Sequence, residues 1–237
     1  MLLIPIKDAN PTVRPPVVTV ALIIGCVVVF LYQLTLPEAL QERFVLRFGM
    51  IPALLLDDTM GAKHIGIPPW ATIFTSMFVH GGFAHIAGNM LFLWIFGNNI
   101  EDALGHLRFV LFYGLAGIAA AMAQAAIDPH STLPMVGASG AISGVLGGYL
   151  VLHPHARVTL LFWIFVFVRT FEAPAYAVLG LWFAFQVVNG VLADPADGGV
   201  AFFAHIGGFV AGLVLIFLFR PGTARYVGEP PRRGPWG

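Results

Sequence analysis

Two residues far apart in the sequence could together perform nucleophilic chemistry. Ser139 lies in the glycine-rich run Gly137-Ala-Ser-Gly140, and His205 lies just before the glycines at positions 207, 208 and 212. A serine hydroxyl is a poor nucleophile until a base takes its proton, and neutral imidazole can do so near physiological pH. We therefore expect Ser139 to be a nucleophile and His205 to serve as its base and then as the acid toward a leaving amine.

His85 and Asn89 are candidates for stabilising the charge that such a reaction develops. Attack on a carbonyl group produces a tetrahedral oxyanion, which needs hydrogen-bond donors aimed at it. The side chains of His85 and Asn89 could supply donors, together with the backbone N–H of Ser139 at a helix start. Because no carboxylate is expected at this level of the membrane, the catalytic unit would be a dyad.

The composition predicts an integral membrane protein. Of 237 residues, 58% are apolar and 10% are charged, whereas an average soluble domain has about 25% charged residues. Basic and acidic residues balance at 12 each, so the net charge gives no evidence for a nucleic-acid partner, and none is expected. The single cysteine, Cys26, lies in an apolar run and cannot form an internal disulfide.

The elements that must position these residues are apolar stretches long enough to be membrane spans. We expect an all-α integral membrane protein with a short N-terminal segment (1–16), a six-span membrane domain (17–220) and a disordered tail (221–237). The connection between the first two spans mixes proline, aromatic and charged residues, which suits the membrane interface. Segment Val158–Phe171 is apolar but short and contains Arg169, so it is either interfacial or part of a span. The expected spans cover about 17–36, 84–100, 108–127, 138–152, 173–193 and 201–219.

Basic residues predict the orientation of these spans, because cytoplasmic loops hold most Lys and Arg. With six spans, nine basic residues share the side of the termini and three lie opposite. We therefore expect both termini in the cytoplasm and a site that opens to the outer side. A bacterial inner membrane is the expected location.

Helix lengths place the four polar residues at a common depth. Ser139 is 15 residues before Pro154, and His205 is 15 residues before Arg220, which corresponds to roughly 22–24 Å along a helix. His85 lies at a similar height, and Asn89 about one turn deeper. A span that starts at Ser139 is too short to cross the hydrocarbon, so the residues before it should dip into the membrane and border water.

Small residues could bring the fourth and sixth spans close together. Gly140, Gly144 and Gly148 recur every four residues on one helix, and His205, Gly208 and Gly212 share a face of the other,. Glycines spaced in this way allow helix backbones to approach closely in lipid. Ser139 and His205 could then reach hydrogen-bond distance.

The motifs His85-Ile-Ala-Gly-Asn89, Gly137-Ala-Ser-Gly140 and Ala204-His-Ile-Gly-Gly-Phe-Val-Ala-Gly212, in this order on alternate spans, resemble those of the rhomboid intramembrane serine proteases. The resemblance covers about residues 70–220. It implies a six-helix rhomboid-like bundle in the lipid bilayer and hydrolysis of single-span membrane proteins in or near their transmembrane segments, toward the outer ends, without a cofactor or metal. It also implies a partly submerged 37–83 connection and entry gated by the 194–200 loop together with the fifth span.

The chain departs from the family pattern in two places. Ser143 stands where some members carry a tyrosine that packs against the histidine, which leaves open what supports His205. The Trp-Arg pair that some members have in the first loop is missing. No feature of the sequence indicates an oligomeric state.

Two other classes of function fit part of the pattern. A haem or metal protein could use His85 and His205, but this would leave Ser139 and Asn89 unexplained. A transporter or a non-catalytic binder of membrane proteins would not need the Ser139 hydroxyl. His153 and His155 could bind a metal or could be an interfacial histidine pair, whereas the sequence has no His-Glu-x-x-His zinc motif,.

Overall fold

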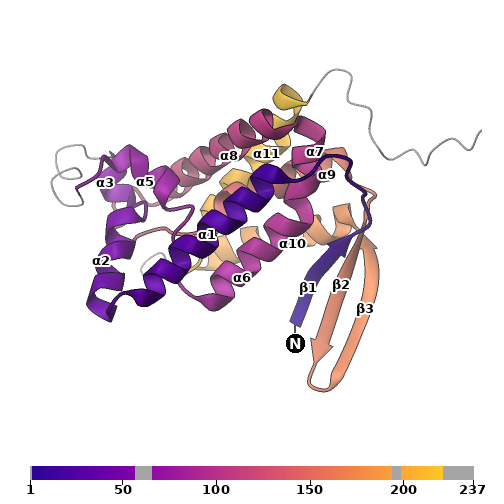
Figure 1. The fold of residues 1–237 in the computed structure, drawn as a ribbon, viewed down its shortest axis with the longest axis horizontal. Helices are drawn as coiled ribbons and strands as arrows, with labels where there is room; N and C mark the ends of the chain where they lie inside the picture. Colours follow the sequence, from indigo (N-terminus) through magenta and orange to yellow (C-terminus); the bar gives the residue numbers. More distant parts are fainter. Residues whose placement is uncertain (1, 57–65, 194–198, 221–237) are drawn as a thin grey trace, which may run out of the picture.

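Apolar helices form the body of the molecule (Figure 1), which the computed structural model describes for residues 2–56, 66–193 and 199–220. Within these ranges, four helices are long and apolar enough to cross a membrane. A fifth apolar helix, α9, is shorter. The four long helices are α1 (Val17–Thr35), α8 (His106–Ile127), α10 (Ala175–Leu192) and α11 (Phe202–Phe219), and α9 covers Ser139–Leu152.

The segment expected as the second span is a continuous helical run with an irregular middle. It begins as α6 (Phe83–Phe92), widens into the π-helical η1 (Leu93–Gly97) and ends as α7 (Asn98–Leu104). Helix therefore occupies each of the six ranges expected from the apolar pattern.

Helix α9 is the centre of the bundle and is buried along most of its length. Its glycines contact α11 directly: a Cβ atom at Gly208 would overlap the carbonyl oxygen of Gly140, and one at Gly212 would overlap that of Gly144. The predicted close approach of these two helices is thus confirmed. Only glycine leaves room for this backbone contact. Close van der Waals packing of this kind holds helices together in lipid, where there is no hydrophobic driving force between them.

The start of α1 is held by a carboxylate from a distant part of the chain. Glu101 accepts hydrogen bonds from the backbone N–H groups of Val18 and Thr19, each at 2.8 Å, and from the Thr19 hydroxyl at 2.7 Å. His106 Nδ1 lies 2.6 Å from the same carboxylate. Because the first N–H groups of a helix lack intrahelical acceptors, Glu101 fastens α7 to the beginning of α1.

The expectation of an all-α protein is wrong, because three strands form an antiparallel sheet in the order β1-β2-β3. They are β1 (Leu2–Asp8), β2 (Arg157–Ile164) and β3 (Phe167–Pro174). Segment Val158–Phe171 is therefore a hairpin and not a membrane span. β-branched and aromatic residues favour extended backbone here, and β1, from the N-terminal segment, pairs with β2.

The described parts of the connection between α1 and α6 (36–56 and 66–82) carry the short helices α2 (Glu38–Phe48), α3 (Pro52–Leu56) and α5 (Pro69–Thr75). Met50 forms a two-bond antiparallel bridge with Met135, with N–O distances of 2.9 and 2.8 Å. The bridge ties this connection to the irregular segment that precedes α9. The predicted disordered tail (221–237) and most of the predicted gating loop (194–200) lie outside the described residues.

Candidate active site

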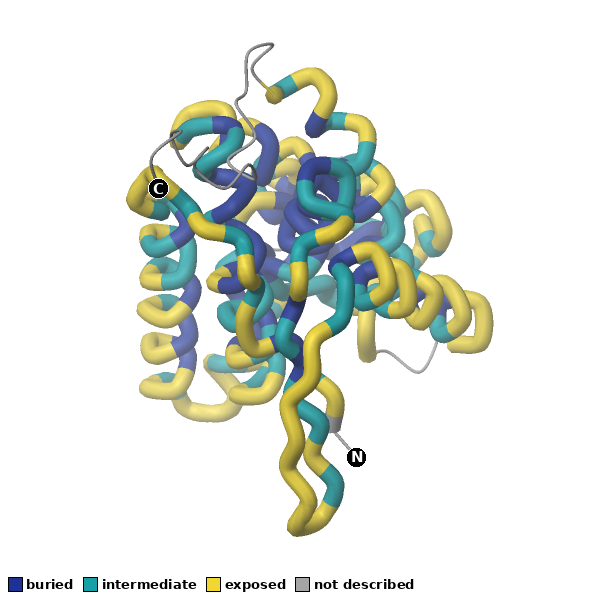
Figure 2. Tube along the Cα trace, turned by 90° about the vertical axis from the view of Figure 1, so that its right-hand side faces the viewer, coloured by how far each residue is buried: buried dark blue, intermediate teal, exposed yellow. Residues whose placement is uncertain are grey.

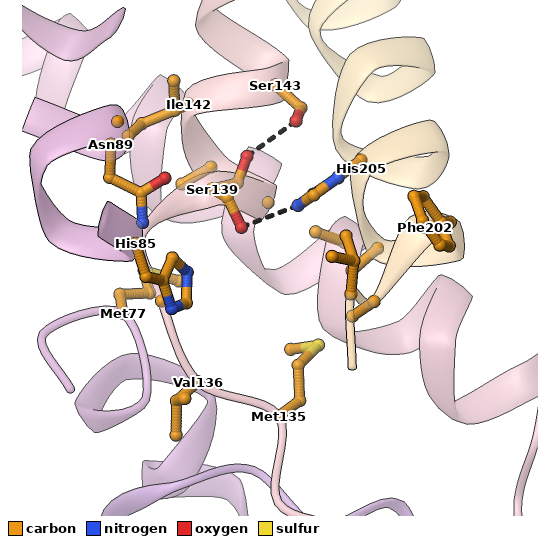
Figure 3. A pocket seen from close by; sticks show the side chains of 18 of the residues that line it. Met77, His85, Asn89, Met135, Val136, Ser139, Ile142, Ser143, Phe202 and His205 are labelled. Carbon is orange, nitrogen blue, oxygen red and sulfur yellow. Dashed lines mark hydrogen bonds between the residues drawn. The ribbon is translucent and has the colours of Figure 1, made fainter. Parts of the chain in front are cut away.

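Ser139 and His205 face each other at the starts of two neighbouring helices (Figure 3). Ser139 is the first residue of α9, and His205 lies in the first turn of α11. The Oγ atom of Ser139 lies 2.7 Å from Nε2 of His205. A hydroxyl donates well to an unprotonated ring nitrogen at this distance, so the pair has the geometry of a nucleophile and its base.

The second ring nitrogen of His205 also has a partner. Nδ1 lies 2.8 Å from Oε1 of Gln186, a buried residue of α10. With Oε1 as the acceptor, Nδ1 carries the proton and the lone pair of Nε2 is left for Ser139. The ring of Trp182, one turn earlier in α10, lies beside the imidazole with a centroid distance of 6.1 Å.

Gln186 and Trp182 were missed by sequence reasoning. The available signal was a glutamine within a largely apolar helix, because a polar side chain without a partner is costly in a membrane,. The support behind His205 therefore comes from α10. Ser143, which stands at the tyrosine position of some family members, instead donates a hydrogen bond to the carbonyl oxygen of Ser139 at 2.6 Å (Figure 3).

His85 and Asn89 lie across the cavity from His205, on α6 (Figure 3). Asn89 is 8% exposed, and its Nδ2 atom has no hydrogen-bond partner among the described residues. A buried donor without a partner is costly and calls for an explanation. Nδ2 of Asn89 is thus a donor that a bound oxyanion could use.

Gly137 makes room for these two side chains. Its φ angle is +114°, a conformation that favours glycine, and its N–H donates to the carbonyl oxygen of Ser76 at 2.8 Å,. A Cβ atom here would lie 2.5 Å from His85 Nε2 and 3.4 Å from Asn89 Nδ2. The glycine before Ser139 therefore keeps the backbone close to both candidate donors.

The loop before α6 is fixed by a buried histidine and a glutamine that the sequence did not single out. The backbone of His80 exchanges two hydrogen bonds with the side chain of Gln33 in α1, both at 3.2 Å. Burial, together with the neighbouring His85, lowers the pKa of His80 to about 4. His80 is thus neutral at pH 7, and its ring packs edge-on against His85 at a centroid distance of 5.2 Å.

All four predicted site residues line one cavity of about 990 Å³. Apolar side chains from α10 and α11, among them Trp182, Phe185 and Phe202, form another part of its wall. A cavity of this size could hold several residues of an extended peptide beside Ser139.

His153 and His155 contact different aromatic partners. The ring of His153 lies 5.1 Å from that of Tyr149, and the ring of His155 lies 5.9 Å from that of Tyr176. Burial lowers the pKa of His153 to about 4, although the nearby Asp102 opposes this shift. Each histidine ring thus packs against a tyrosine near the C-terminal end of α9.

A bundle of apolar helices that encloses a serine, a histidine and the unpaired donor of Asn89 in one cavity defines a multi-pass membrane protein with a hydrolase-like site. The family model described as the Rhomboid domain matches residues 68–222. The chain belongs to the rhomboid family.

Several curated proteins are similar to this chain. Rhomboid protease GluP of Bacillus subtilis (strain 168) is 34% identical over 145 residues, which are 60% of this chain and 25% of the relative. Rhomboid protein 1, mitochondrial, of Saccharomyces cerevisiae is 33% identical over 150 residues, covering 60% of this chain and 40% of the relative. Putative rhomboid protease YdcA of Bacillus subtilis is 34% identical over 119 residues, covering 48% of this chain and 59% of the relative. The chain thus spans less than two thirds of each of these relatives.

Proposed function

We propose that this protein is an intramembrane serine endopeptidase that cleaves peptide bonds in or near the transmembrane segments of single-span membrane proteins. The observation that carries the proposal is the 2.7 Å separation of Ser139 Oγ and His205 Nε2 inside a cavity of the helical bundle. Membership of the rhomboid family and similarity to proteins named as rhomboid proteases support it.

In the proposed reaction, His205 Nε2 takes the hydroxyl proton of Ser139 as Oγ attacks the carbonyl carbon of the substrate. The oxyanion that forms is stabilised by His85, by Asn89 Nδ2 and by the backbone N–H of Ser139. As the intermediate collapses, the C–N bond breaks and His205 returns the proton to the leaving amine. Water, activated by the same histidine, then hydrolyses the acyl-enzyme and regenerates Ser139.

Gln186 serves as a positioning residue in this scheme. Its Oε1 atom holds the Nδ1 proton of His205, so the reactive Nε2 atom points at Ser139 throughout the cycle. This function replaces the carboxylate that completes a triad in many serine hydrolases. The dyad is therefore supported by a neutral amide.

The proposed topology has six spans with both termini in the cytoplasm and the cavity open to the outer side. The run from α6 to α7 supplies the second span and α9 the fourth. The short length of α9, 14 residues, corresponds to about 21 Å. With the C-terminal end of α9 at the cytoplasmic surface, this length would leave Ser139 below the outer membrane surface, where a substrate helix must unwind to reach it.

Two measurements on the purified full chain test the proposal. Wild type should react covalently with a fluorophosphonate probe and cleave a model single-span substrate, whereas Ser139→Ala and His205→Ala should do neither while keeping their thermal transitions. Ser143→Ala is the matched control, because its hydroxyl lies one turn from Ser139 and should be dispensable for labelling. Cleavage that persists in Ser139→Ala would contradict the dyad and favour a non-catalytic function.

A further inference from the structure

The β2–β3 hairpin ends in an exposed apolar tip. Phe165 is 89% exposed, Val166 is 87% and Phe167 is 68%. The hairpin projects past the helices and is exposed along most of its length (Figure 2). A cluster of large apolar side chains in this position is unfavourable in water and indicates a contact.

The turn itself is built from residues that a hydrated turn would avoid. Ile164 pairs with Phe167 across the strands, which leaves Phe165 and Val166 as a two-residue connection. Such turns usually contain Asn-Gly or a similar pair, because their central residues have positive φ. Phe165 nevertheless adopts a φ of +51°, so the tip keeps a bulky aromatic residue where glycine or asparagine would be more favourable.

Both faces of the hairpin are apolar near this turn. Trp163 and Val168 form a pair on one face, and Ile164 and Phe167 form the next pair on the other,. A flat protein partner would cover only one face. A medium that surrounds the tip on all sides satisfies both faces, and the lipid at a membrane surface is such a medium.

The connections of the hairpin place it beside the membrane. Its first strand follows the end of α9 at Leu152, and its second strand leads directly into the start of α10 at Ala175. The strands are eight residues long, so the tip lies about 25 Å from the base of the hairpin, where α10 begins at Ala175. Trp163 and the phenylalanines match the aromatic composition of interfacial segments, and Arg169 can extend its charged group toward water.

We infer that the tip of the β2–β3 hairpin, residues 163–168, inserts into the lipid interface of the leaflet that borders the end of α9 and the start of α10. The sheet then acts as a lateral anchor. Charge is concentrated at its base, where Arg157 and Glu172 form an exposed ion pair at 3.6 Å. This inference depends on the membrane location of the chain and not on its catalytic activity.

Site-specific fluorescence in lipid nanodiscs tests the anchor. Cys26, buried in α1, is replaced by alanine, and an environment-sensitive nitrobenzoxadiazole label is attached to Val166→Cys or, as a control, to Glu172→Cys at the hairpin base. With one protein copy per disc, the label at position 166 should emit at shorter wavelength and lose most of its fluorescence to doxyl-labelled lipids. The label at position 172 should stay in water and remain bright.

A second variant separates insertion by the protein from insertion by the label. Phe165→Asn combined with Val166→Gly gives the turn a favourable sequence and removes the apolar tip, so it should preserve the sheet. A label at Val168→Cys should then be quenched by lipid in the parent protein and much less in this variant. Equal, water-like emission at positions 166 and 172 overturns the inference, as does a blue shift seen only when two copies share a disc.

Discussion

Nδ1 of His205 in α11 lies 2.8 Å from Oε1 of Gln186 in α10, while Nε2 of the same ring lies 2.7 Å from Ser139 in α9. One imidazole therefore joins three helices through polar contacts. Its two nitrogens have different partners, and this difference determines which one can accept the proton of the serine.

Loss of the acceptor at position 186 should slow nucleophilic attack. In Gln186→Leu, Nδ1 loses a neutral hydrogen bond of about 0.5–1.5 kcal/mol, which predicts a fall of about 2- to 13-fold in kcat and in the rate of fluorophosphonate labelling. KM should change little, because Gln186 acts through His205. Gln186→Glu retains an acceptor oxygen and should preserve more labelling than Gln186→Leu. Equal labelling rates in wild type and Gln186→Leu would exclude a positioning role.

Gly137→Ala should disturb the candidate oxyanion donors. The added Cβ atom would be 2.5 Å from His85 Nε2, and the alanine would have to adopt the positive φ of Gly137. If a donor is displaced, kcat should fall by about 10²–10³-fold. Gly180→Ala in α10 is the matched control, because a Cβ there meets no atom within 4 Å. Steady-state cleavage of a single-span substrate compares the two, and full activity in Gly137→Ala would argue against the assigned donors.

Gly208→Ala should separate α11 from α9. The new methyl group would overlap the carbonyl oxygen of Gly140, and overpacking of this kind typically costs about 1–3 kcal/mol. We expect a lower thermal midpoint in detergent and slower fluorophosphonate labelling, since Ser139 and His205 lie on the two helices that move apart. Gly114→Ala in α8, where space is open, should leave both quantities unchanged. A stable, fully labelled Gly208→Ala protein would show that the helices tolerate a wider separation.

The pH dependence of stability should report on Asp8, which fastens β1 to the bundle. Its Oδ2 accepts hydrogen bonds from the Tyr149 hydroxyl and from Asn99 Nδ2, both at 2.8 Å. Burial raises the pKa of Asp8 above its ordinary value even though these bonds oppose the rise. The folded state therefore binds the proton more tightly than the unfolded state.

This difference in pKa between the folded and unfolded states determines whether stability rises or falls with pH. The contribution of Asp8 to the stability of the fold is fully present below its unfolded pKa of about 3.9. This contribution is lost as pH rises through the higher pKa of the folded state. Thermal midpoints measured from pH 3 upward should fall with pH more in wild type than in Asp8→Asn. Parallel profiles for the two proteins would mean that burial does not perturb this carboxyl group.

The sequence by itself determined the membrane class and the positions of the six apolar helical segments, because runs of apolar residues and their lengths are local properties. It also determined which faces of α9 and α11 are lined by glycine, and thereby the meeting of Ser139 with His205. Counting residues along single helices was enough for this, since Ser139 and His205 each lie 15 residues before a residue at the C-terminal end of an apolar stretch, Pro154 and Arg220.

Only the tertiary structure decided what lies behind His205 and what residues 157–174 become. The contact with Gln186 depends on the rotation of α10 about its axis, which an apolar helix with weak amphipathic character does not reveal. Segment 157–174 has no span-length pattern, and its extended form depends on pairing with β1 from the other end of the chain. Such long-range pairing depends on backbone hydrogen bonds that form only when the fold brings the two segments together. No local pattern in either segment specifies its partner.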